Sequence, residues 1–484
     1  MPPELIASMS VRTNMQKPRV GILFFGNEWF WSQKMNGFGP EFLKLIESDI
    51  DSTKENLSSF LEVVSSGIIF HEDKAKAAAI ELREERVDLV IFCPVVWSSD
   101  RVVLAALSET DSKLPVIMWC SSPYRELSAK ITVPELVRTT GTVGALQSAS
   151  AMKRLGRSLI PIAGTRDDER VLKEIHEYSV AAKVTNELKR MKVGLLPWRY
   201  EDMVGTYVDE AKVLSKLGPK MEPVSVGELF RASEQVTESE LKSFVEYLKK
   251  NFDIVGVSEK SLLTSGRASL ALAKIVEQHN LDAIAIQDMD DEMHTLLKTR
   301  PCLRAKSMAE RHVPVGMEGD ALGALSMIVL QKLTDKAAIF CEIFTFDVPN
   351  NSLLMGHIGV PDPSSAQDPS RMKIVPDREF QHYDEVEGAC MYFTHREGIV
   401  TLLAIVSEAE NFRMIVSRGE SLPIGEKLEG YAHMVVRIDP PVKHFLETAL
   451  LLGANQHWAV VNEDAVKKLE KLAELMGLEK TIIV

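Results

Sequence analysis

The sequence predicts an α/β protein with two doubly wound parallel-sheet domains, followed by a β-rich C-terminal domain that is antiparallel and barrel-like. In about the first two-thirds of the 484 residues, short apolar runs alternate with helix-like segments, as β-α repeats do. After about residue 330 the apolar runs lengthen and follow one another without helices, which is typical of an antiparallel sheet. We therefore expect domains at residues 1–170, 171–330 and 331–484.

The N-terminal domain is predicted from three apolar runs that suit buried parallel strands, at residues 18–25, 88–94 and 114–120. Helix-like segments such as AKAAAIELREER lie between them. Ligands of such sheets collect beyond the carboxyl ends of the strands, where the loops here are aromatic and hydroxylic, as a sugar site requires. Packing against a neighbouring domain or subunit is an alternative role for these aromatic side chains. The candidate substrate contacts are Trp29, Trp31 and Trp97.

The central domain repeats this architecture without repeating the sequence. We expect its strands at residues 191–197, 252–258, 281–288 and 312–318. The intervening segments carry apolar residues at three- and four-residue spacing, as helices on a sheet do. Candidate neighbours of a bound sugar stand at the strand ends, although each could also be structural. These candidates are Arg199, Met203 and Gln287.

The C-terminal domain is predicted from several long apolar runs separated by Gly, Pro and Asn turns, beginning at Ala337. The proline-rich stretch at residues 360–380 is expected to be a surface loop. A last helix, strand and helix follow, and the loop between the first helix and the strand carries His457.

Charge and cysteine content exclude several classes of protein. A net charge of -13 and a pI near 5.5 argue against a general binder of nucleic acid or membrane surfaces, because such proteins present a basic face to phosphate. The five cysteines are odd in number, scattered and without a CxxC pair, so no disulfide framework or structural zinc site is indicated. Small neutral ligands remain open.

The N-terminal residues lack an apolar core long enough for a signal peptide, and no run approaches the ~18 apolar residues that a membrane helix needs. We therefore expect a cytoplasmic enzyme. The sequence contains no phosphate loop, no GxGxxG after the first strand and no GxSxG. Nucleotide chemistry is not supported.

A candidate site lies between residues 313 and 360. Glu318 follows an apolar strand, Glu342 lies inside a second apolar run, and His357 stands close behind between two glycine residues. Two carboxylates and neutral imidazoles suit Mn²⁺, Fe²⁺, Co²⁺ or Zn²⁺ better than a thiolate metal. If these side chains converge with His457, the ion keeps open positions for the vicinal hydroxyl and carbonyl of an open-chain sugar, whose carbonyl it would polarise.

Such a site suits proton transfer between C1 and C2 of a sugar through a cis-enediol, which needs a base at the carbon and an acid at the carbonyl oxygen. Glu318 and Glu342 are the candidate catalytic residues, and they can serve as metal ligands at the same time. The spacing of these residues is not specific to metal sites. It also suits buried glutamates paired with Lys or Arg, and a structural histidine at position 357.

Four segments resemble the L-arabinose isomerase and L-fucose isomerase superfamily. MEGDALGALSM carries Glu318, CEIFTFDVPNNSLLMGHIG carries Glu342 and His357, and LLGANQHWAVV carries His457. WRYEDMVGTYVDEAKV, at residues 198–213, is similar to the segment that opens the middle domain of that family. The chain departs from the arabinose isomerases in its GNEWFW loop and in its single closing histidine. It departs from the fucose isomerases in having Glu at the second acidic position.

The resemblance implies a three-domain subunit that holds Mn²⁺, with Co²⁺, Fe²⁺ or Mg²⁺ as alternatives, through two acidic residues and histidine. It also implies a homo-oligomer, a hexamer or trimer, in which the N-terminal domain of one subunit completes the site of another. The loop from Trp29 to Trp31 would then form a sugar-facing wall supplied in trans.

We therefore expect a metal-dependent aldose-ketose isomerase acting on a pentose or 6-deoxyhexose of the L-fucose, D-arabinose or L-arabinose type. A different class of function also remains open, because two tandem doubly wound domains can serve as a sugar-binding or regulatory protein without turnover. A third possibility is an isomerase of another keto-sugar or a cyclic polyol.

Overall fold

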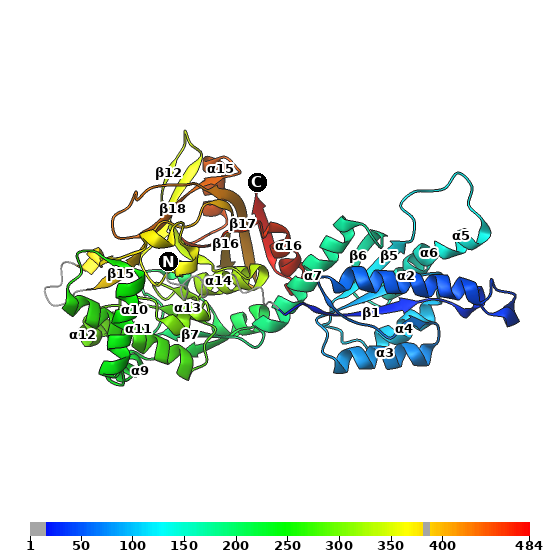
Figure 1. The fold of residues 1–484 in the computed structure, drawn as a ribbon, viewed down its shortest axis with the longest axis horizontal. Coiled ribbons are helices and arrows are strands. Elements are labelled where there is room, and N and C mark those ends of the chain that lie inside the picture. Colours follow the sequence, from blue (N-terminus) through cyan, green and yellow to red (C-terminus); the bar gives the residue numbers. More distant parts are fainter. Residues whose placement is uncertain (1–15, 381–387) are drawn as a thin grey trace. The chain divides into compact units, whose positions relative to one another are not determined.

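The computed structural model describes residues 16–380 and 388–484. These residues fall into two compact units, an N-terminal unit at 16–186 and a C-terminal unit at 187–484. Each unit has its own parallel sheet, and the C-terminal unit adds a strand-rich part, shown in yellow to red in Figure 1. The predicted fold class is confirmed, whereas the domain boundaries near residues 170 and 330 stay predictions.

The N-terminal unit is built on a parallel sheet in the order β2-β1-β4-β5-β6, with β3 also paired to β1. Its central strands β1 and β4 are buried along nearly their whole length, because helices cover such a sheet on both faces. The strands are β1 (Arg19–Phe25), β2 (Glu62–Val64), β3 (Ile68–Ile69), β4 (Leu89–Pro94), β5 (Val116–Ser122) and β6 (Ile160–Thr165).

The helices of this unit bury their small and branched apolar residues against the sheet, among them Ala79, Leu82 and Val103. Side chains cap several helix starts; Ser99, for example, accepts the backbone N–H of Arg101 at the start of α4. The helices are α2 (Pro40–Ser58), α3 (Glu72–Glu84), α4 (Asp100–Glu109), α5 (Val133–Arg138), α6 (Gly141–Arg154) and α7 (Glu169–Leu188), whose last two residues belong to the C-terminal unit.

The C-terminal unit begins with a second parallel sheet, in the order β11-β10-β7-β8. Three of its strands lie where the apolar runs predict them, and β8 adds an edge strand that the sequence pattern did not reveal. The predicted strand at 252–258 is wrong as a member of this sheet, because only β9 (Asp253–Ile254) forms there and it pairs elsewhere. The strands are β7 (Lys192–Leu196), β8 (Lys220–Pro223), β10 (Ala283–Ile286) and β11 (Val315–Gly316).

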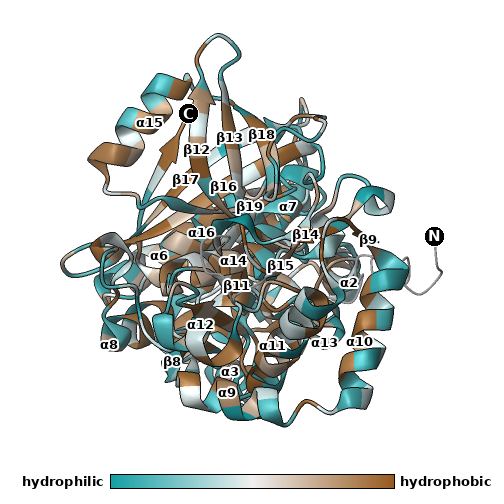
Figure 2. Cartoon of the chain, turned by 90° about the vertical axis from the view of Figure 1, so that its left-hand side faces the viewer, coloured by the Kyte–Doolittle hydropathy of each residue, from teal (hydrophilic) through white to brown (hydrophobic). Residues whose placement is uncertain are grey.

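Several helices surround this sheet, and two of them begin with a capping box, in which Ser225 pairs with Glu228 and Thr237 with Glu240. In Figure 2, α10 alternates between teal and brown, as an amphipathic helix does, and its buried residues recur at three- and four-residue spacing. These helices are α8 (Glu210–Lys212), α9 (Val226–Glu234), α10 (Glu238–Asn251), α11 (Glu259–Gln278), α12 (Asp291–Leu297) and α13 (Lys306–Glu310).

Helix α14 (Ala321–Thr334) joins the parallel sheet to the strand-rich part of the unit. It is buried around nearly its whole circumference, which its almost uninterrupted apolar sequence requires. It contacts β7, β10 and β11 of the parallel sheet, and it also contacts β12, β16 and β19 of the strand-rich part. The loop that precedes α14 therefore lies where the two sheets meet.

The strand-rich part is a mostly antiparallel sheet whose pairing closes on itself. The strands follow the order β16-β19-β12-β13-β18-β17, and β17 pairs back with β16, while β20 lies parallel to β17. Figure 2 shows brown residues along β16 and β17. The strands are β12 (Ile339–Asp347), β13 (Ser352–His357), β16 (Gly398–Ser407), β17 (Phe412–Ser421), β18 (Ala432–Ile438), β19 (His457–Val461) and β20 (Glu479–Ile483). Helices α15 (Val442–Leu451) and α16 (Val466–Met476) flank β19 in the sequence.

The stretch at 360–380 is not the surface loop that its prolines predict. It contains β14 (Lys373–Pro376), which pairs with β9 on one side and with β15 (Ala389–Tyr392) on the other. Its apolar residues Met372 and Ile374 join a buried cluster with residues of α10 and α11. Proline at the end of this short strand is compatible with pairing, because it leaves the other backbone donors in place.

Among the helices of residues 16–380 and 388–484, none combines the length and apolar character that a membrane crossing needs.

Candidate metal centre

Four side chains of the C-terminal unit converge where its parallel sheet meets its closed, mostly antiparallel sheet. Glu318, Glu342, His357 and His457 each offer a ligand atom, and these atoms all lie within 4.8 Å of one another. The strand register accounts for three of them, because Glu342 on β12 lies opposite His457 on β19 and opposite Gly356, the residue before His357, on β13. Hydrogen bonding between strands thus brings together residues that are far apart in the chain.

Glu318 reaches the same point from the loop between β11 and α14. It has a left-handed backbone with φ of 58°, and the following Gly319 has φ of 68°. A Cβ at Gly319 would lie 2.7 Å from the carbonyl oxygen of Trp198 and 2.9 Å from Cα of Arg199, so only glycine fits against this neighbouring loop. The two left-handed residues turn the chain sharply from the sheet into the helix.

The ring nitrogens of both histidines are oriented toward a common point. Nδ1 of His357 donates to the carbonyl oxygen of Ile358 at 2.5 Å, and Nδ1 of His457 donates to Oδ2 of Asp320 at 2.9 Å. Each Nδ1 must carry the proton, because both acceptors are oxygens without one, so in the neutral ring each Nε2 presents a lone pair. Both Nε2 atoms are buried and have no hydrogen-bond partner among the described residues.

The carboxylates lie close to these nitrogens. Nε2 of His457 is 3.1 Å from Oε2 of Glu318, a contact that becomes a hydrogen bond only when Nε2 is protonated. Nε2 of His357 is 3.9 Å both from Oε1 of Glu318 and from Oε2 of Glu342. Buried lone pairs that face carboxylates are unfavourable unless a cation, either a proton or a metal ion, lies between them. The residues present therefore fit a divalent metal ion.

The pKa values of the Glu318 and Glu342 carboxylates are shifted in opposite directions. Burial raises the pKa of Glu318, but the hydrogen bond to His457 and the charges of both histidines outweigh it and lower that pKa overall. Burial also raises the pKa of Glu342, and there the histidine charges do not compensate, so the pKa stays raised. Glu318 is thus the more persistent anion, whereas Glu342 binds a proton more readily.

The pKa of His457 is raised to about 9. Burial lowers it, but hydrogen bonding to Asp320 and Glu318 more than compensates. Without an ion, His457 therefore carries a second proton at neutral pH, on the nitrogen that faces the carboxylates. The same negative surroundings favour a metal cation at that point.

Asp320 is the residue of this site that the sequence interpretation missed. It is fully buried, and its Oδ1 accepts the N–H of Gly323 to cap α14, while its Oδ2 accepts from His457. Asn455 also donates to Oδ2, at 3.2 Å. An Asp before an apolar helix is recognisable as a cap in sequence, but its second role depends on β19 lying beside it.

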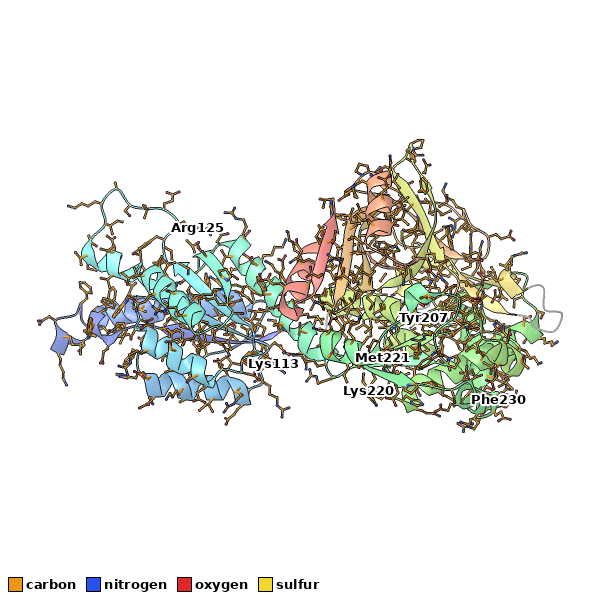
Figure 3. All side chains as sticks on the ribbon, turned by 180° about the vertical axis from the view of Figure 1, so that it is seen from behind. Lys113, Arg125, Tyr207, Lys220, Met221 and Phe230 are labelled. Atoms are coloured by element: carbon orange, nitrogen blue, oxygen red, sulfur yellow. The ribbon has the colours of Figure 1, made fainter. Side chains whose placement is uncertain are left out.

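Of the candidate sugar neighbours that the sequence predicts in the central domain, Met203 and Arg199 flank this centre. Gln287 instead forms a hydrogen bond within its own turn. Met203 accepts a hydrogen bond at Sδ from Nε2 of Gln456 at 3.0 Å, and the same nitrogen is 3.5 Å from Oε2 of Glu318. Arg199 stacks on the rings of Tyr207 and Trp198, with Cζ 4.3 Å and 5.0 Å from their centroids; Figure 3 labels Tyr207. The amide oxygen of Gln287 accepts the backbone N–H of Met289 at 2.9 Å.

The three tryptophan candidates belong to the N-terminal unit. The exposed ring of Trp29 packs on Trp97 with centroids 5.8 Å apart, and Nε1 of Trp97 donates to the side chain of Gln147. Trp31 is buried and packs edge-on against Phe70. Their assignment as substrate contacts stays a prediction.

Comparisons with known proteins relate the chain to sugar isomerases. Residues 337–479, which include three of the four converging residues, match the L-arabinose isomerase C-terminal domain family. Proteins named sulfoquinovose isomerase are similar over most of their length: that of Alkalicoccus urumqiensis is 21% identical over 81% of this chain and 85% of its own, and that of Priestia megaterium is 22% identical over 83% and 87%. The L-arabinose isomerase of Thermotoga neapolitana is 24% identical over 69% of this chain and 67% of its own. The chain thus resembles the L-arabinose isomerase superfamily as a distant relative, without being a close match to its type members.

Proposed function

We propose that this protein is a metal-dependent aldose-ketose isomerase. The observation that carries the proposal is the convergence of Glu318, Glu342 and the buried Nε2 atoms of two histidines on one point. The relatives named as sugar isomerases support the reaction class.

The metal ion would be held by Glu318, Glu342, His357 and His457, a mixed carboxylate and imidazole set that suits Mn²⁺, with Co²⁺, Fe²⁺ or Mg²⁺ as alternatives. When bound, it would polarise the carbonyl of an open-chain sugar as a Lewis acid. Asp320 orients His457 by accepting its Nδ1 proton, as carboxylates behind metal-binding histidines do.

The two glutamates divide the proton transfers between them. Glu342, with the raised pKa, removes the proton from C2 of the aldose and returns it to C1, so that the C–H bond broken at C2 is replaced by one at C1. Glu318, the more persistent anion, relays the proton that leaves the C2 hydroxyl and arrives at the C1 oxygen. The intermediate between these transfers is a cis-enediol, and the sum of the steps is a ketose with no net change in atoms.

The proposed substrate is a pentose or a 6-deoxyhexose of the L-fucose, D-arabinose or L-arabinose type. A second candidate is a 6-deoxyhexose with an anionic group at C6, because relatives named sulfoquinovose isomerase match over more than four-fifths of their length. Arg199 supports this candidate, since its guanidinium is stacked on aromatic rings and forms no ion pair with a carboxylate of the described residues. A planar cation held in this way is suited to a sulfonate or phosphate.

The test is to remove metal from the purified protein, add back Mn²⁺, Co²⁺ or Mg²⁺, and measure ketose formation from neutral pentoses, neutral 6-deoxyhexoses and sulfoquinovose. Turnover of at least one sugar only with metal is expected. Metal-independent turnover would contradict the proposal. Metal-dependent sugar binding without any turnover would instead favour a sugar-binding or regulatory protein.

A further inference from the structure

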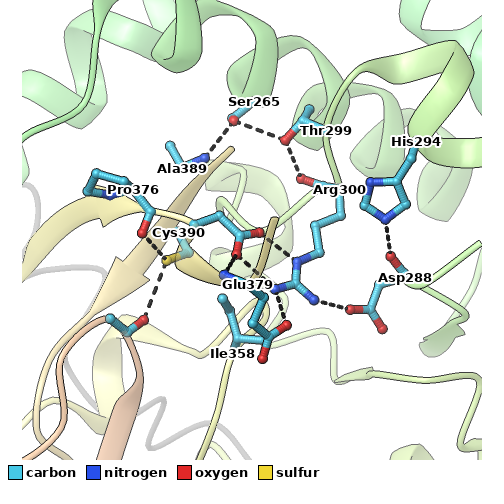
Figure 4. Close-up of polar contacts among 12 residues, drawn as sticks. Ser265, Asp288, His294, Thr299, Arg300, Ile358, Pro376, Glu379, Ala389 and Cys390 are labelled. Atoms are coloured by element: carbon cyan, nitrogen blue, oxygen red, sulfur yellow. Dashed lines mark hydrogen bonds and ion pairs between the residues drawn. The ribbon is translucent and has the colours of Figure 1, made fainter. Parts of the chain in front are cut away.

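Arg300 forms ion pairs with Asp288, Asp377 and Glu379 (Figure 4), and Asp288 also contacts the backbone of Glu318. Arg300, whose side chain is 1% exposed, donates from Nη1 to Asp288 at 2.7 Å. It also donates from Nε and Nη2 to the two oxygens of Asp377, at 2.6 Å and 2.9 Å, and from Nη2 to Glu379 at 2.5 Å. Among the described residues, one guanidinium thus holds together three acidic side chains from two separate stretches of chain.

Asp288 uses its two oxygens for different tasks. Oδ2 accepts from Arg300, while Oδ1 accepts the backbone N–H of Glu318 at 2.8 Å. The carbonyl oxygen of Asp288 lies 2.7 Å from Nε2 of His294, which ties its own backbone to the start of α12. Both oxygens of the carboxylate that contacts Glu318 are therefore engaged in hydrogen bonds.

The contact with Glu318 falls where the backbone most needs support. A left-handed φ of 58° is unfavourable for a residue with a side chain, and a charge-assisted bond to its N–H offsets that cost. The same φ directs the Glu318 carboxylate toward Nε2 of His457, 3.1 Å away. Loss of the Asp288 contact would let the backbone relax and move the carboxylate away from this position.

The ion pairs of Arg300 also reach the strand that carries Glu342. The hydroxyl of Tyr431 donates to the second oxygen of Glu379 at 2.7 Å, and the Tyr431 ring packs edge-on against Phe344 of β12, with centroids 5.6 Å apart. Phe344 lies two residues beyond Glu342 on that strand. Arg300 is therefore connected both to the loop of Glu318 and to the strand of Glu342.

We propose that Asp288 and Arg300 are positioning residues that hold the Glu318 and Glu342 carboxylates at the spacing that the metal centre needs. Among the contacts that the described residues show, Asp288 acts through the backbone of Glu318, and Arg300 acts through Asp288 and Glu379. This inference rests on the proposed function of the same centre.

The experiment compares D288N and R300K with a matched control, D362N. Asp362 is also buried and also pairs with an arginine, Arg304 at 3.2 Å, but it has no contact with Glu318 among those the structure shows. The readouts are the Kd for Mn²⁺, the visible spectrum of the Co²⁺-loaded protein, kcat and KM, and the thermal unfolding midpoint of the metal-free protein. The spectrum reports the ligand geometry, which a loss of stability alone does not change.

D288N and R300K are expected to weaken Mn²⁺ binding by about 10- to 100-fold, as changes behind metal ligands do, and to alter the Co²⁺ spectrum and lower kcat. D362N should lower the unfolding midpoint without changing the spectrum or the Kd. If D288N and R300K change only the unfolding midpoint, as the control does, the inference is wrong.

E379Q keeps the test decisive if the buried variants do not fold. The Glu379 side chain is 33% exposed, so its amide is tolerated, and a smaller change in the Co²⁺ spectrum is expected. If neither D288N nor R300K folds and the Co²⁺ spectrum of E379Q is unchanged, the inference is wrong. Failure of the wild-type protein to bind Mn²⁺ at all would instead overturn the proposed function.

Discussion

Nδ1 of His457 donates a hydrogen bond to Oδ2 of the fully buried Asp320 at 2.9 Å, and this contact decides which ring nitrogen faces the centre. Asp320 also caps α14 through its other oxygen. The Asp320 carboxylate thus connects the start of α14 to His457, a candidate metal ligand that lies far along the chain.

We predict that D320N weakens Mn²⁺ binding by about 10- to 100-fold, because the amide leaves Nδ1 of His457 without an anionic acceptor. Asn is as good a helix cap as Asp, so the unfolding free energy should fall by less than about 1 kcal/mol from the capping role. Metal titration and thermal unfolding of the same samples check both statements. D209N, which changes another Asp cap, at the start of α8, should leave metal binding unchanged.

The pKa of His457 predicts a pH dependence with a definite sign. Because its pKa is about 9 in the folded metal-free protein, above the ordinary value of 6.5, its stabilising contribution is complete below about pH 6.5 and is lost as pH rises toward 9. Over the same range Mn²⁺ should bind more tightly, since the competing proton leaves. Unfolding midpoints and metal affinities measured from pH 6 to about 9.5 check this, and D320N should flatten both profiles. A metal affinity independent of pH would contradict the assignment.

The pKa of Glu318 is lowered and that of Glu342 is raised, so replacing each residue by glutamine should have a different effect. E342Q should reduce kcat by about 10²- to 10⁴-fold, the usual contribution of a general acid or base. E318Q should reduce metal affinity more than E342Q does, because Glu318 is the more persistent anion and is close to both histidines. E246Q, on the exposed side of α10, serves as the control for amide substitution. Full activity in E318Q would contradict the mechanism.

Arg199 provides a test of the substrate class. If the substrate is anionic, R199M should raise KM for sulfoquinovose by about 10- to 100-fold, the equivalent of a charge-assisted hydrogen bond, and leave KM for neutral sugars unchanged. The control is R231M, at an exposed position of α9. An equal effect of R199M on neutral and anionic sugars would point to a general packing role on Tyr207 and Trp198.

Gly319 should tolerate no side chain. G319A combines a left-handed φ of 68° with a Cβ that would lie 2.7 Å from the carbonyl oxygen of Trp198, so we expect a loss of more than about 1 kcal/mol in unfolding free energy together with weaker metal binding. Gly477 has a similar φ of 64° and nothing within 4 Å of its Cβ position. G477A should therefore lose only the part of the unfolding free energy that comes from the left-handed backbone, and it should bind metal normally. Chemical denaturation and metal titration of the pair distinguish the two effects.

Local patterns in the sequence were sufficient for the strands and helices whose own residues decide their structure. The buried strands β1, β4 and β10 are continuous apolar runs, and such runs in β-α alternation predict a parallel sheet. The predictions failed where pairing with a distant strand decides the structure of a segment. The run at 252–258 lies outside the parallel sheet, and the proline-rich stretch at 360–380 is partly buried, because β9 and β14 pair with each other across the fold.

The sequence by itself determined the fold class and the identity of four acidic and histidine side chains that apolar surroundings make unusual. Only the tertiary structure decided that they meet. Glu342 lies beside His457 because β12 and β19 pair, and Glu318 reaches them because left-handed backbone at Glu318 and Gly319 turns its loop toward the second sheet. The supporting roles of Asp320 and Asp288 depend on the same long-range contacts, and side chains whose partners lie so far along the chain leave no periodic signal in sequence.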